Sequence, residues 1–310
     1  PLPEKKTPPE NAKKIAVVGA GPAGLTAAAD LADRGYAVTV YEATSGAGGM
    51  LRWGIPAYRL PKDILDYEIE LIRRKGITFL YNTRVGIDIP MDTVRQNNDA
   101  VFLSVGTQSS RKLGLEGEDK TGITYGLEFL RKVGDKDNLP RLNGRIVVIG
   151  GGNVAVDVAR SAMRLGADAV EMVSLEQRYE MPALPEEVAA ALEENIIINN
   201  GWGPNRILGN GTVKGIELKR CTRVFDESGR FSPMYNDKET TTLKTDQIVI
   251  AIGQAIEQDS LDNMGVASDR NYYRINEITL ETSVKGVFAG GDNIPGSATV
   301  INAVGAGKRA

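Results

Sequence analysis

Lys14-Ile-Ala-Val-Val-Gly-Ala-Gly-Pro-Ala-Gly24 joins a short apolar run to a cluster of glycines, and a helical stretch from Leu25 to Arg34 follows it. The strand Ala37-Val-Thr-Val-Tyr-Glu42 comes next. This order of strand, glycine turn, helix and strand predicts two parallel strands joined by a crossover helix, and therefore an α/β fold.

A second copy of the same pattern begins at Arg145-Ile-Val-Val-Ile-Gly-Gly-Gly-Asn-Val-Ala155. Its helical stretch runs to about Leu165, and the strand Ala169-Val-Glu-Met-Val-Ser174 follows. A chain of 310 residues suits two domains better than one. We therefore expect two Rossmann-like dinucleotide-binding domains.

The segments between and after these copies predict how the two domains share the chain. A strand at 100–105 ends at a glycine, and the run at 246–253 mirrors it, while residues 212–245 alternate around a turn as a small antiparallel element does. An amphipathic helix at 61–75 and a last strand at 286–289 complete the pattern. We expect one discontinuous domain, 14–112 plus 246–310, with a second domain, 113–245, inserted in it.

The two ends of the chain read differently from its middle. Residues 1–13 contain four prolines and several charges, which favours an extended linker. The chain begins without Met and stops within a helical pattern, so we expect it to be part of a longer protein.

Composition excludes several classes of chemistry. The net charge is −3 and no run is rich in Lys or Arg, which argues against nucleic acid as a partner. No apolar stretch approaches the roughly 18 residues of a membrane span. With no histidine and one cysteine, the chain has no Ser-His-Asp triad, no Cys-His dyad, no internal disulfide and no His-ligated metal. We expect Cys221 to be an ordinary thiol in a strand, and a reducing, cytoplasmic location.

The first glycine turn, residues 19–24, fits the G-x-G-x-x-G pattern of dinucleotide sites. Gly19 would permit the tight turn, Gly21 the approach of a pyrophosphate, and Gly24 the packing of helix on strand. The helix N-terminus offers N–H groups to phosphates, and Glu42, 18 residues after Gly24, suits ribose hydroxyls. The alternative is a non-binding turn with a surface glutamate.

The second glycine turn, residues 150–155, fits the variant G-x-G-x-x-A. Glu176 lies 24 residues after Gly152, where a carboxylate pairs with a 2′-hydroxyl and repels a 2′-phosphate. This favours NADH over NADPH. Two alternatives stay open: Glu176 is a solvated loop residue, or nearby Arg178 serves a 2′-phosphate.

Four further motifs carry a resemblance to a known family. They are Gly48-Gly-Met-Leu-Arg-Trp-Gly-Ile-Pro56 continuing into Tyr58-Arg-Leu-Pro61, Ser104-Val-Gly-Thr107, its second copy Ala251-Ile-Gly253, and Phe288-Ala-Gly-Gly-Asp292 followed by Ala298-Thr-Val-Ile-Asn-Ala303. With them the chain resembles the small (beta) subunit of glutamate synthase over residues 14–310. The same group includes the flavin subunits of ferredoxin-linked and electron-bifurcating complexes.

The resemblance implies a pyridine nucleotide-disulfide oxidoreductase-like architecture with FAD in the first domain and a nicotinamide dinucleotide in the second. For FAD it implies contacts from the first glycine turn, from Glu42 at the adenosine ribose, from the backbone of Val85 at the adenine, from Asp292 at a ribityl hydroxyl, and from the 299–300 turn at the flavin. The full set for FAD is Gly19, Gly21, Pro22, Ala23, Gly24, Glu42, Ala43, Gly49, Leu51, Gly54, Arg59, Val85, Val105, Gly106, Thr107, Gly291, Asp292, Thr299 and Val300. The set for the nicotinamide dinucleotide is Gly150, Gly151, Gly152, Asn153, Val154, Glu176 and Gly253.

This sequence departs from the family at three places. The Cys-rich iron–sulfur domain that precedes this core in the family is absent, the final helix is short, and Leu175-Glu176 replaces the tandem arginines of many NADPH-using relatives. Any iron–sulfur cluster must then lie outside the chain, on another domain or a partner subunit.

The expected function is hydride transfer between NADH and FAD, with onward electron transfer to iron–sulfur centres. Because the cofactors carry this chemistry, we expect no catalytic side chain. The rivals are a thioredoxin-reductase-like enzyme, which needs a Cys-x-x-Cys that is missing here, a flavin monooxygenase, and a non-catalytic dinucleotide-binding module that serves assembly.

Overall fold

The computed structural model describes residues 2–135, 139–296 and 299–310, and it divides the chain into two compact units. The first unit comprises Pro1–Ser109 and Ala255–Ala310, and the second, Ser110–Gln254, is inserted in it. Two boundaries therefore differ from those expected. Residues 246–254 were expected in the first domain, but strand β13 (Gln247–Ile250) pairs with β7 (Arg145–Ile149) and β6 (Ile123–Tyr125) of the second unit. Residues 110–112 also belong to the second unit.

The first unit is built on a five-stranded parallel sheet. Its order is β17 (Val287–Ala289), β4 (Ala100–Leu103), β1 (Lys14–Val18), β2 (Ala37–Tyr41) and β3 (Thr78–Leu80). Helix α1 (Pro22–Asp33) crosses from β1 to β2, as the glycine turn predicts. The strands run through nearly continuous apolar residues because both faces of the sheet are covered.

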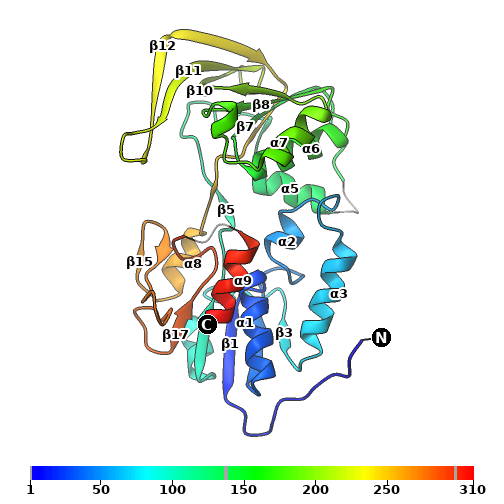
Figure 1. The fold of residues 1–310 in the computed structure, drawn as a ribbon, viewed down its shortest axis with the longest axis vertical. Coiled ribbons are helices and arrows are strands. Elements are labelled where there is room, and N and C mark those ends of the chain that lie inside the picture. The colour runs from blue at the N-terminus through cyan, green and yellow to red at the C-terminus, as the bar shows by residue number, and fades with distance from the viewer. Residues whose placement is uncertain (1, 136–138, 297–298) are drawn as a thin grey trace. The chain divides into compact units, whose positions relative to one another are not determined.

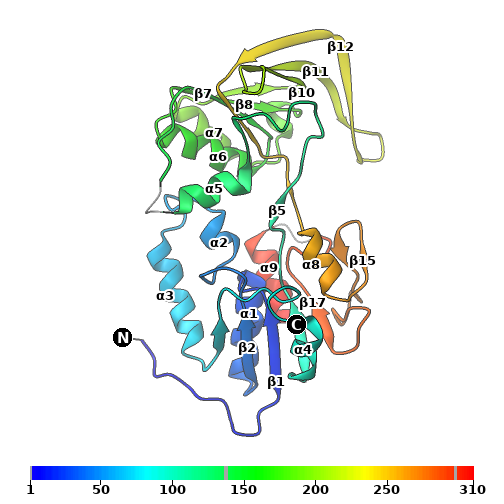
Figure 2. The same cartoon turned by 180° about the vertical axis from the view of Figure 1, so that it is seen from behind.

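Alternate side chains of these strands form two separate cores. Val17, Val40 and Phe102 pack with α1, α3 (Lys62–Arg73) and α9 (Val300–Arg309) on one face of the sheet (Figure 1). On the other face, Val18 and Leu103 pack with α4 (Met91–Gln96) and α8 (Gln258–Asn263), which Figure 2 shows from behind. The unit is therefore a three-layer sandwich.

The second unit repeats this sheet with the same strand connectivity around its glycine turn. The order is β6, β13, β7, β8 (Ala169–Ser174) and β9 (Ile197–Asn200), all parallel. Helices α5 (Gly126–Gly134), α6 (Asn153–Arg164) and α7 (Pro185–Glu193) cover one face. A small antiparallel sheet, β10 (Trp202–Leu208), β11 (Gly215–Phe225) and β12 (Phe231–Lys244), covers the other. The two doubly covered sheets confirm the predicted α/β fold.

The remaining elements are short. They are α2 (Met50–Trp53), β5 (Ser109–Ser110), the 3-10 helix η1 (Arg178–Glu180), β14 (Gln254–Ala255), β15 (Ser268–Asp269) and β16 (Tyr272–Tyr273). Residues 2–13 contain no helix or strand, and the Lys6 N–H donates to Arg74 O at 2.8 Å, so this segment lies along the first unit. Within the described residues, no helix is long and apolar enough to cross a membrane.

Helices α1 and α9 approach closely through a glycine. A Cβ added to Gly307 would lie 2.3 Å from Ala23 O and 2.9 Å from Thr26 Cβ, so only glycine fits between the helices. Gly305 lies on the same helix, and a Cβ there would meet nothing within 4 Å. The helix that closes the first unit therefore depends on one of these two glycines and not on the other.

We expect Gly307→Ala to destabilise the protein by about 1–3 kcal/mol, because the added methyl group overpacks the helix contact. Gly305→Ala is the matched control and should be neutral or stabilising by about 0.5–1 kcal/mol, since alanine favours the helix. Urea unfolding followed by circular dichroism measures both. Equal stability of the two variants would contradict this account of the contact.

Candidate functional site

The first glycine turn is pressed against the end of strand β4. Gly19 has a φ of +102°, and a Cβ there would lie 2.4 Å from Ser104 O. A Cβ on Gly24 would lie 2.0 Å from Gly19 O. Glycine is therefore required at both positions by contacts within the protein.

Gly21 is different because nothing in the protein requires glycine there. Its φ is −76°, which any residue adopts, and a Cβ at this position would meet nothing within 4 Å. Gly21 is also the N-cap of α1, and no side chain caps this helix end. No side chain among the described residues thus occupies this helix end, as an anion-binding turn requires.

Glu42 stabilises this turn by a hydrogen bond from inside the protein. Its side chain is buried, and Oε2 accepts the Ala20 N–H at 2.8 Å while Oε1 accepts the N–H and hydroxyl of Thr44 at 2.8 and 2.7 Å. A surface glutamate, the alternative raised by the sequence, is therefore wrong. Each carboxylate oxygen has two acceptor sites, so Oε2 keeps capacity for a ribose hydroxyl.

Two distant segments pack onto the same turn. Gly49 lies so close to Gly21 that a Cβ added to Gly49 would be 2.8 Å from Gly21 Cα. The Gly48 N–H donates to Ala20 O at 2.8 Å. From the C-terminal part of the unit, a Cβ on Gly291 would lie 2.9 Å from Ala23 Cβ. The structure thus brings together three of the sequence motifs around one turn.

Asn293 is a buried polar residue that the sequence reasoning missed. Its Nδ2 donates to Leu103 O at 2.9 Å, and among the described residues its buried Oδ1 has no hydrogen-bond partner. Leaving a buried acceptor unpaired costs about 1–3 kcal/mol, which favours a bound water or ligand donor at this point. The only signal in the sequence was an amide directly after Gly-Gly-Asp.

The other residues expected at FAD occupy varied surroundings. Val85 lies in the core with Val18 and Tyr41, and Thr107 is also buried. Ala43 is exposed, whereas Pro22, Leu51, Gly54, Arg59, Val105, Gly106 and Asp292 are half-buried. Thr299 and Val300 are exposed at the start of α9, the end opposite its contact with Ala23. Ala298, within the last motif, lies outside the described residues.

The second glycine turn repeats the geometry of the first. Gly150 has a φ of +143°, and a Cβ there would lie 2.3 Å from Ala251 O. Gly152, the N-cap of α6, has a φ of −93°, and its Cβ would meet nothing within 4 Å. As at Gly21, neither the backbone nor the packing of the protein explains this glycine.

The carboxylate of Glu176 lies against this second turn. Ser174 Oγ donates to Glu176 Oε2 at 2.5 Å, and a Cβ on Gly151 would lie 2.7 Å from the same oxygen. Arg178 is exposed in η1. Glu176 is therefore a fixed side chain beside the turn and not a freely solvated one.

The other residues expected at the nicotinamide dinucleotide have varied surroundings. Asn153 Oδ1 accepts the Leu184 N–H at 2.8 Å, which secures the segment before α7. Val154 lies beside Gly126, whose Cβ would be 3.4 Å from Val154 Cγ1. Gly253 is exposed, with a φ of +113°, and its carbonyl accepts the Arg111 N–H at 3.0 Å.

Cys221 has the surroundings of an inert thiol. It is buried in β11, and its Sγ lies 3.4 Å from Arg223 O. Burial raises the pKa of the Cys221 thiol above its ordinary value, which disfavours the reactive thiolate. In the part of the chain that the structure describes, no three His, Cys, Asp or Glu side chains gather as a metal site.

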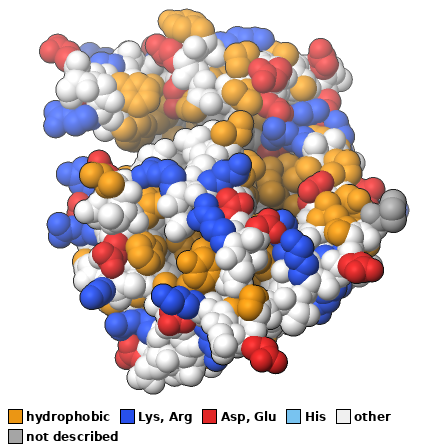
Figure 3. All heavy atoms as spheres, turned by 60° about the horizontal axis from the view of Figure 1, so that its bottom comes forward, with side chains coloured by type: hydrophobic (Ala, Val, Ile, Leu, Met, Phe, Trp, Pro, Cys, Tyr) orange, Lys and Arg blue, Asp and Glu red, His pale blue; other side chains and the backbone are white. Residues whose placement is uncertain are grey.

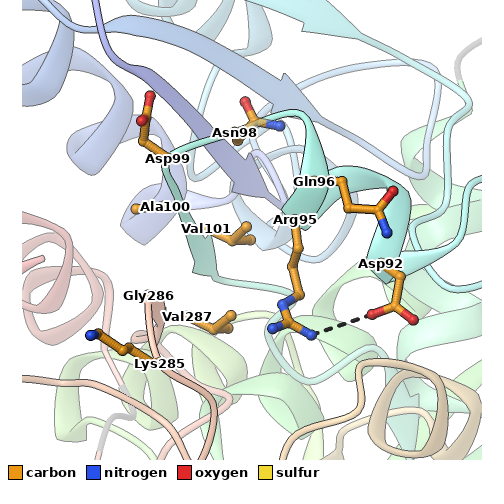
Figure 4. A pocket seen from close by; sticks show the side chains of 10 residues that line it. All are labelled: Asp92, Arg95, Gln96, Asn98, Asp99, Ala100, Val101, Lys285, Gly286 and Val287. Carbon is orange, nitrogen blue, oxygen red and sulfur yellow. Dashed lines mark hydrogen bonds and ion pairs between the residues drawn. The ribbon is translucent and has the colours of Figure 1, made fainter.

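A polar groove of about 250 Å³ lies at the amino ends of the strands of the first sheet, opposite to the end that carries the glycine turn (Figure 4). Arg95 and Asp92 of α4, paired at 3.3 Å, and Lys285 line it beside the amino ends of β4 and β17. Ligands of such sheets bind at the carboxyl ends of the strands, so this groove is not the dinucleotide site. On the face drawn in Figure 3, basic and acidic side chains are interspersed.

Comparison with known proteins identifies the family. Residues 13–307 match the pyridine nucleotide-disulphide oxidoreductase family. The chain belongs to this family. Its members are FAD-dependent NAD(P)H oxidoreductases, so the chain is an enzyme core of this class that binds FAD and a nicotinamide dinucleotide.

Similar proteins include several subunits of larger enzymes. The chain is 44% identical to the NADP(+)-dependent formate dehydrogenase subunit beta of Moorella thermoacetica over 99% of this chain and 44% of that subunit. It is 34% identical to the NAD-dependent dihydropyrimidine dehydrogenase subunit PreT of Escherichia coli, over 96% of this chain and 66% of the subunit. It is 31% identical to the glutamate synthase [NADPH] small chain of Escherichia coli, over 97% and 68%. The resemblance to the glutamate synthase small subunit is thereby confirmed.

Solved structures share the fold. FprA of Mycobacterium tuberculosis in complex with NADPH superposes with a TM-score of 0.82 at 20% identity, over 96% of this chain and 83% of that one. Thioredoxin reductase of T. acidophilum gives a TM-score of 0.69 at 22% identity, over 97% and 96%. The predicted two-domain architecture is confirmed. The chain spans less than half the length of the formate dehydrogenase subunit.

Proposed function

We propose that the chain transfers hydride between NADH, held by the second unit, and FAD, held by the first, and that electrons then pass to iron–sulfur centres. The observation that supports this most strongly is the pair Gly21 and Gly152. Both are glycines that neither backbone conformation nor internal packing requires, and both stand at an uncapped helix N-terminus. Close approach of a pyrophosphate is the remaining reason for glycine at such a position.

The residues present fit FAD in the first unit. Gly21 and the first turn of α1 would face the pyrophosphate, and Glu42 would accept a hydrogen bond from the adenosine ribose through the free capacity of Oε2. Asp292 would bind a ribityl hydroxyl. The orphaned Asn293 Oδ1 could accept from a water or hydroxyl held in the same region.

The residues present also fit a nicotinamide dinucleotide in the second unit. Gly152 and the N-terminus of α6 would face its pyrophosphate, and Glu176 would meet the adenosine ribose. Bound flavin and nicotinamide supply the hydride chemistry between them. The protein contributes binding and orientation; it has no histidine, and its one thiol is buried.

The preference for NADH rests on Glu176. A 2′-phosphate about 4 Å from a carboxylate is repelled by roughly 1–4 kcal/mol, depending on screening. A 2′-hydroxyl instead donates a charge-assisted hydrogen bond of about 1.5–3 kcal/mol. The names of the relatives do not decide the choice, since the formate dehydrogenase subunit is NADP(+)-dependent and the dihydropyrimidine dehydrogenase subunit NAD-dependent.

The proposed partner is an iron–sulfur domain or subunit. Several relatives are named as subunits, among them an NADPH-Fe(3+) oxidoreductase subunit beta of Geobacter sulfurreducens, 50% of which the chain covers. The unpaired Cys221 suits a reducing compartment, and we propose the cytoplasm. A non-catalytic, FAD-holding assembly module is disfavoured, because such a module has no use for a second intact dinucleotide turn.

The central test is anaerobic. The chain reconstituted with FAD should be yellow and hold roughly one flavin per chain. NADH should then bleach the visible absorbance of this flavin. A chain that binds FAD but is never bleached by either nicotinamide dinucleotide would be the assembly module instead. A chain that does not bind FAD would contradict both the oxidoreductase and the assembly-module hypotheses.

Reciprocal substitutions test which unit holds which cofactor. Gly152→Val should abolish reduction by NADH while FAD stays bound, because the side chain enters the open space before α6 without a clash inside the protein. Gly21→Val should do the reverse and prevent FAD binding, for the same reason at α1. Flavin absorbance after gel filtration and nucleotide binding by calorimetry measure the two losses. Loss of both cofactors in either variant would show that the assignment by unit is wrong.

For the wild-type chain we expect kcat/KM to favour NADH over NADPH by at least about tenfold. Glu176→Arg should reduce or invert this ratio, because it replaces a carboxylate by a guanidinium that binds phosphate. Arg178→Gln is the control and should leave the ratio unchanged. Stopped-flow flavin reduction at equal, subsaturating nucleotide concentrations gives the ratio. Faster reaction with NADPH, lost in Arg178→Gln, would assign the ribose to Arg178 instead.

A further inference from the structure

The two units can be aligned residue by residue at their glycine turns. The Gly19 N–H donates to Tyr41 O at 2.8 Å, and the Gly150 N–H donates to Val173 O at 2.9 Å. Tyr41 therefore corresponds to Val173. The two residues that follow at +1 and +3 are Glu42 and Thr44 in the first unit, and Ser174 and Glu176 in the second.

At these positions the two units contain the same hydrogen bond with its partners exchanged. In the first unit the hydroxyl of Thr44 donates back to the carboxylate of Glu42 at 2.7 Å. In the second unit the hydroxyl of Ser174 donates forward to the carboxylate of Glu176 at 2.5 Å. The carboxylate beside the second turn thus comes from two residues later in the chain, and the hydroxyl occupies the place of Glu42.

This exchange explains why residue 151 is glycine. A Cβ there would lie 2.6 Å from Ser174 Oγ and 2.7 Å from Glu176 Oε2, although the backbone of Gly151 does not require glycine. In the first unit the corresponding residue is Ala20, whose N–H is held by Glu42. The serine–glutamate pair therefore occupies space that a side chain at 151 would fill.

The backbone of Ser174 belongs to the sheet, whereas that of Glu176 lies outside regular structure. Ser174 is 1% exposed and pairs with Asn200 of β9, so its Cα belongs to the sheet. Glu176 lies beyond the strand, in a bend before η1, and is partly exposed. A long carboxylate side chain outside regular structure loses its orientation unless a rigid neighbour holds it.

We propose that Ser174 is the positioning residue for nucleotide selectivity, and that its hydroxyl holds the carboxylate of Glu176 against the second glycine turn. This inference rests on the proposed role of Glu176 at the adenosine ribose. Without the hydroxyl, the carboxylate turns toward solvent, a 2′-hydroxyl loses its acceptor and a 2′-phosphate meets less repulsion. Selectivity then falls while the hydride step itself is unchanged.

The test is a double-mutant cycle on the FAD-loaded chain. Ser174→Ala, Glu176→Gln and the double variant are compared with wild type by anaerobic flavin reduction with NADH and with NADPH. The readout is the ratio of the two kcat/KM values, with kcat and KM resolved separately. Ser161→Ala is the matched control, because Ser161 is also a buried serine of the second unit, and its Oγ has no hydrogen-bond partner among the described residues.

Ser174→Ala should lower the NADH-to-NADPH ratio about threefold or more, through a higher KM for NADH with little change in kcat. The double variant should match Glu176→Gln within about twofold, since Ser174 acts only through Glu176. Ser161→Ala should keep the wild-type ratio.

Two results would overturn the inference while leaving the proposed function intact: an unchanged ratio in Ser174→Ala when Glu176→Gln lowers it, or additive losses in the double variant. An unchanged ratio in Glu176→Gln would instead overturn the role of Glu176 itself. A kcat loss in Ser174→Ala at constant ratio would show that the serine is merely structural.

Discussion

Close approach between a glycine turn and the end of a neighbouring strand is the constraint on which both units depend. Gly19 lies against Ser104 O, and Gly150 lies against Ala251 O, in each case too near for any side chain. The adjoining helix can begin directly above the carboxyl ends of the strands only because this contact is possible. Gly21 and Gly152 follow two residues later, each at a helix N-terminus that no side chain caps, and a Cβ on either would meet nothing within 4 Å.

Two hydroxyl–carboxylate pairs then complete the turns in different ways. In the first unit Glu42 is buried, and its two carboxylate oxygens accept hydrogen bonds from the Ala20 N–H and from Thr44. In the second unit the carboxylate is partly exposed and only its hydroxyl partner, Ser174, is buried. The first arrangement stabilises the turn itself, whereas the second presents a carboxylate to whatever lies in front of the turn.

The glycine turns, both parallel sheets and the antiparallel element at 212–245 were predictable, because spacing and alternation depend only on local sequence. The boundary at 245 was wrong because the run 246–253 resembles the one that ends at Gly106, and resemblance alone does not say which sheet a strand joins; β13 pairs with β7. Ser174 and Asn293 were not predictable, since a serine at a strand end and an amide after Gly-Gly-Asp become notable only when their partners are known. Glu176 was predictable as a residue but not as one held in place.

In the proposed function the choice of nucleotide depends on where side chains are placed, because the cofactors and not the side chains carry the hydride chemistry. The chain has no histidine, and burial raises the pKa of its one thiol, so neither of these residue types supplies a proton donor or acceptor near neutral pH. What the protein controls is which nucleotide fits and in which orientation. In the proposed mechanism a single hydrogen bond from a rigid strand orients the carboxylate that selects the nucleotide, because discrimination between a hydroxyl and a phosphate depends on charge at one point. Ser174 would meet that requirement by its position in the sheet, since its hydroxyl holds a carboxylate that lies two residues beyond the strand.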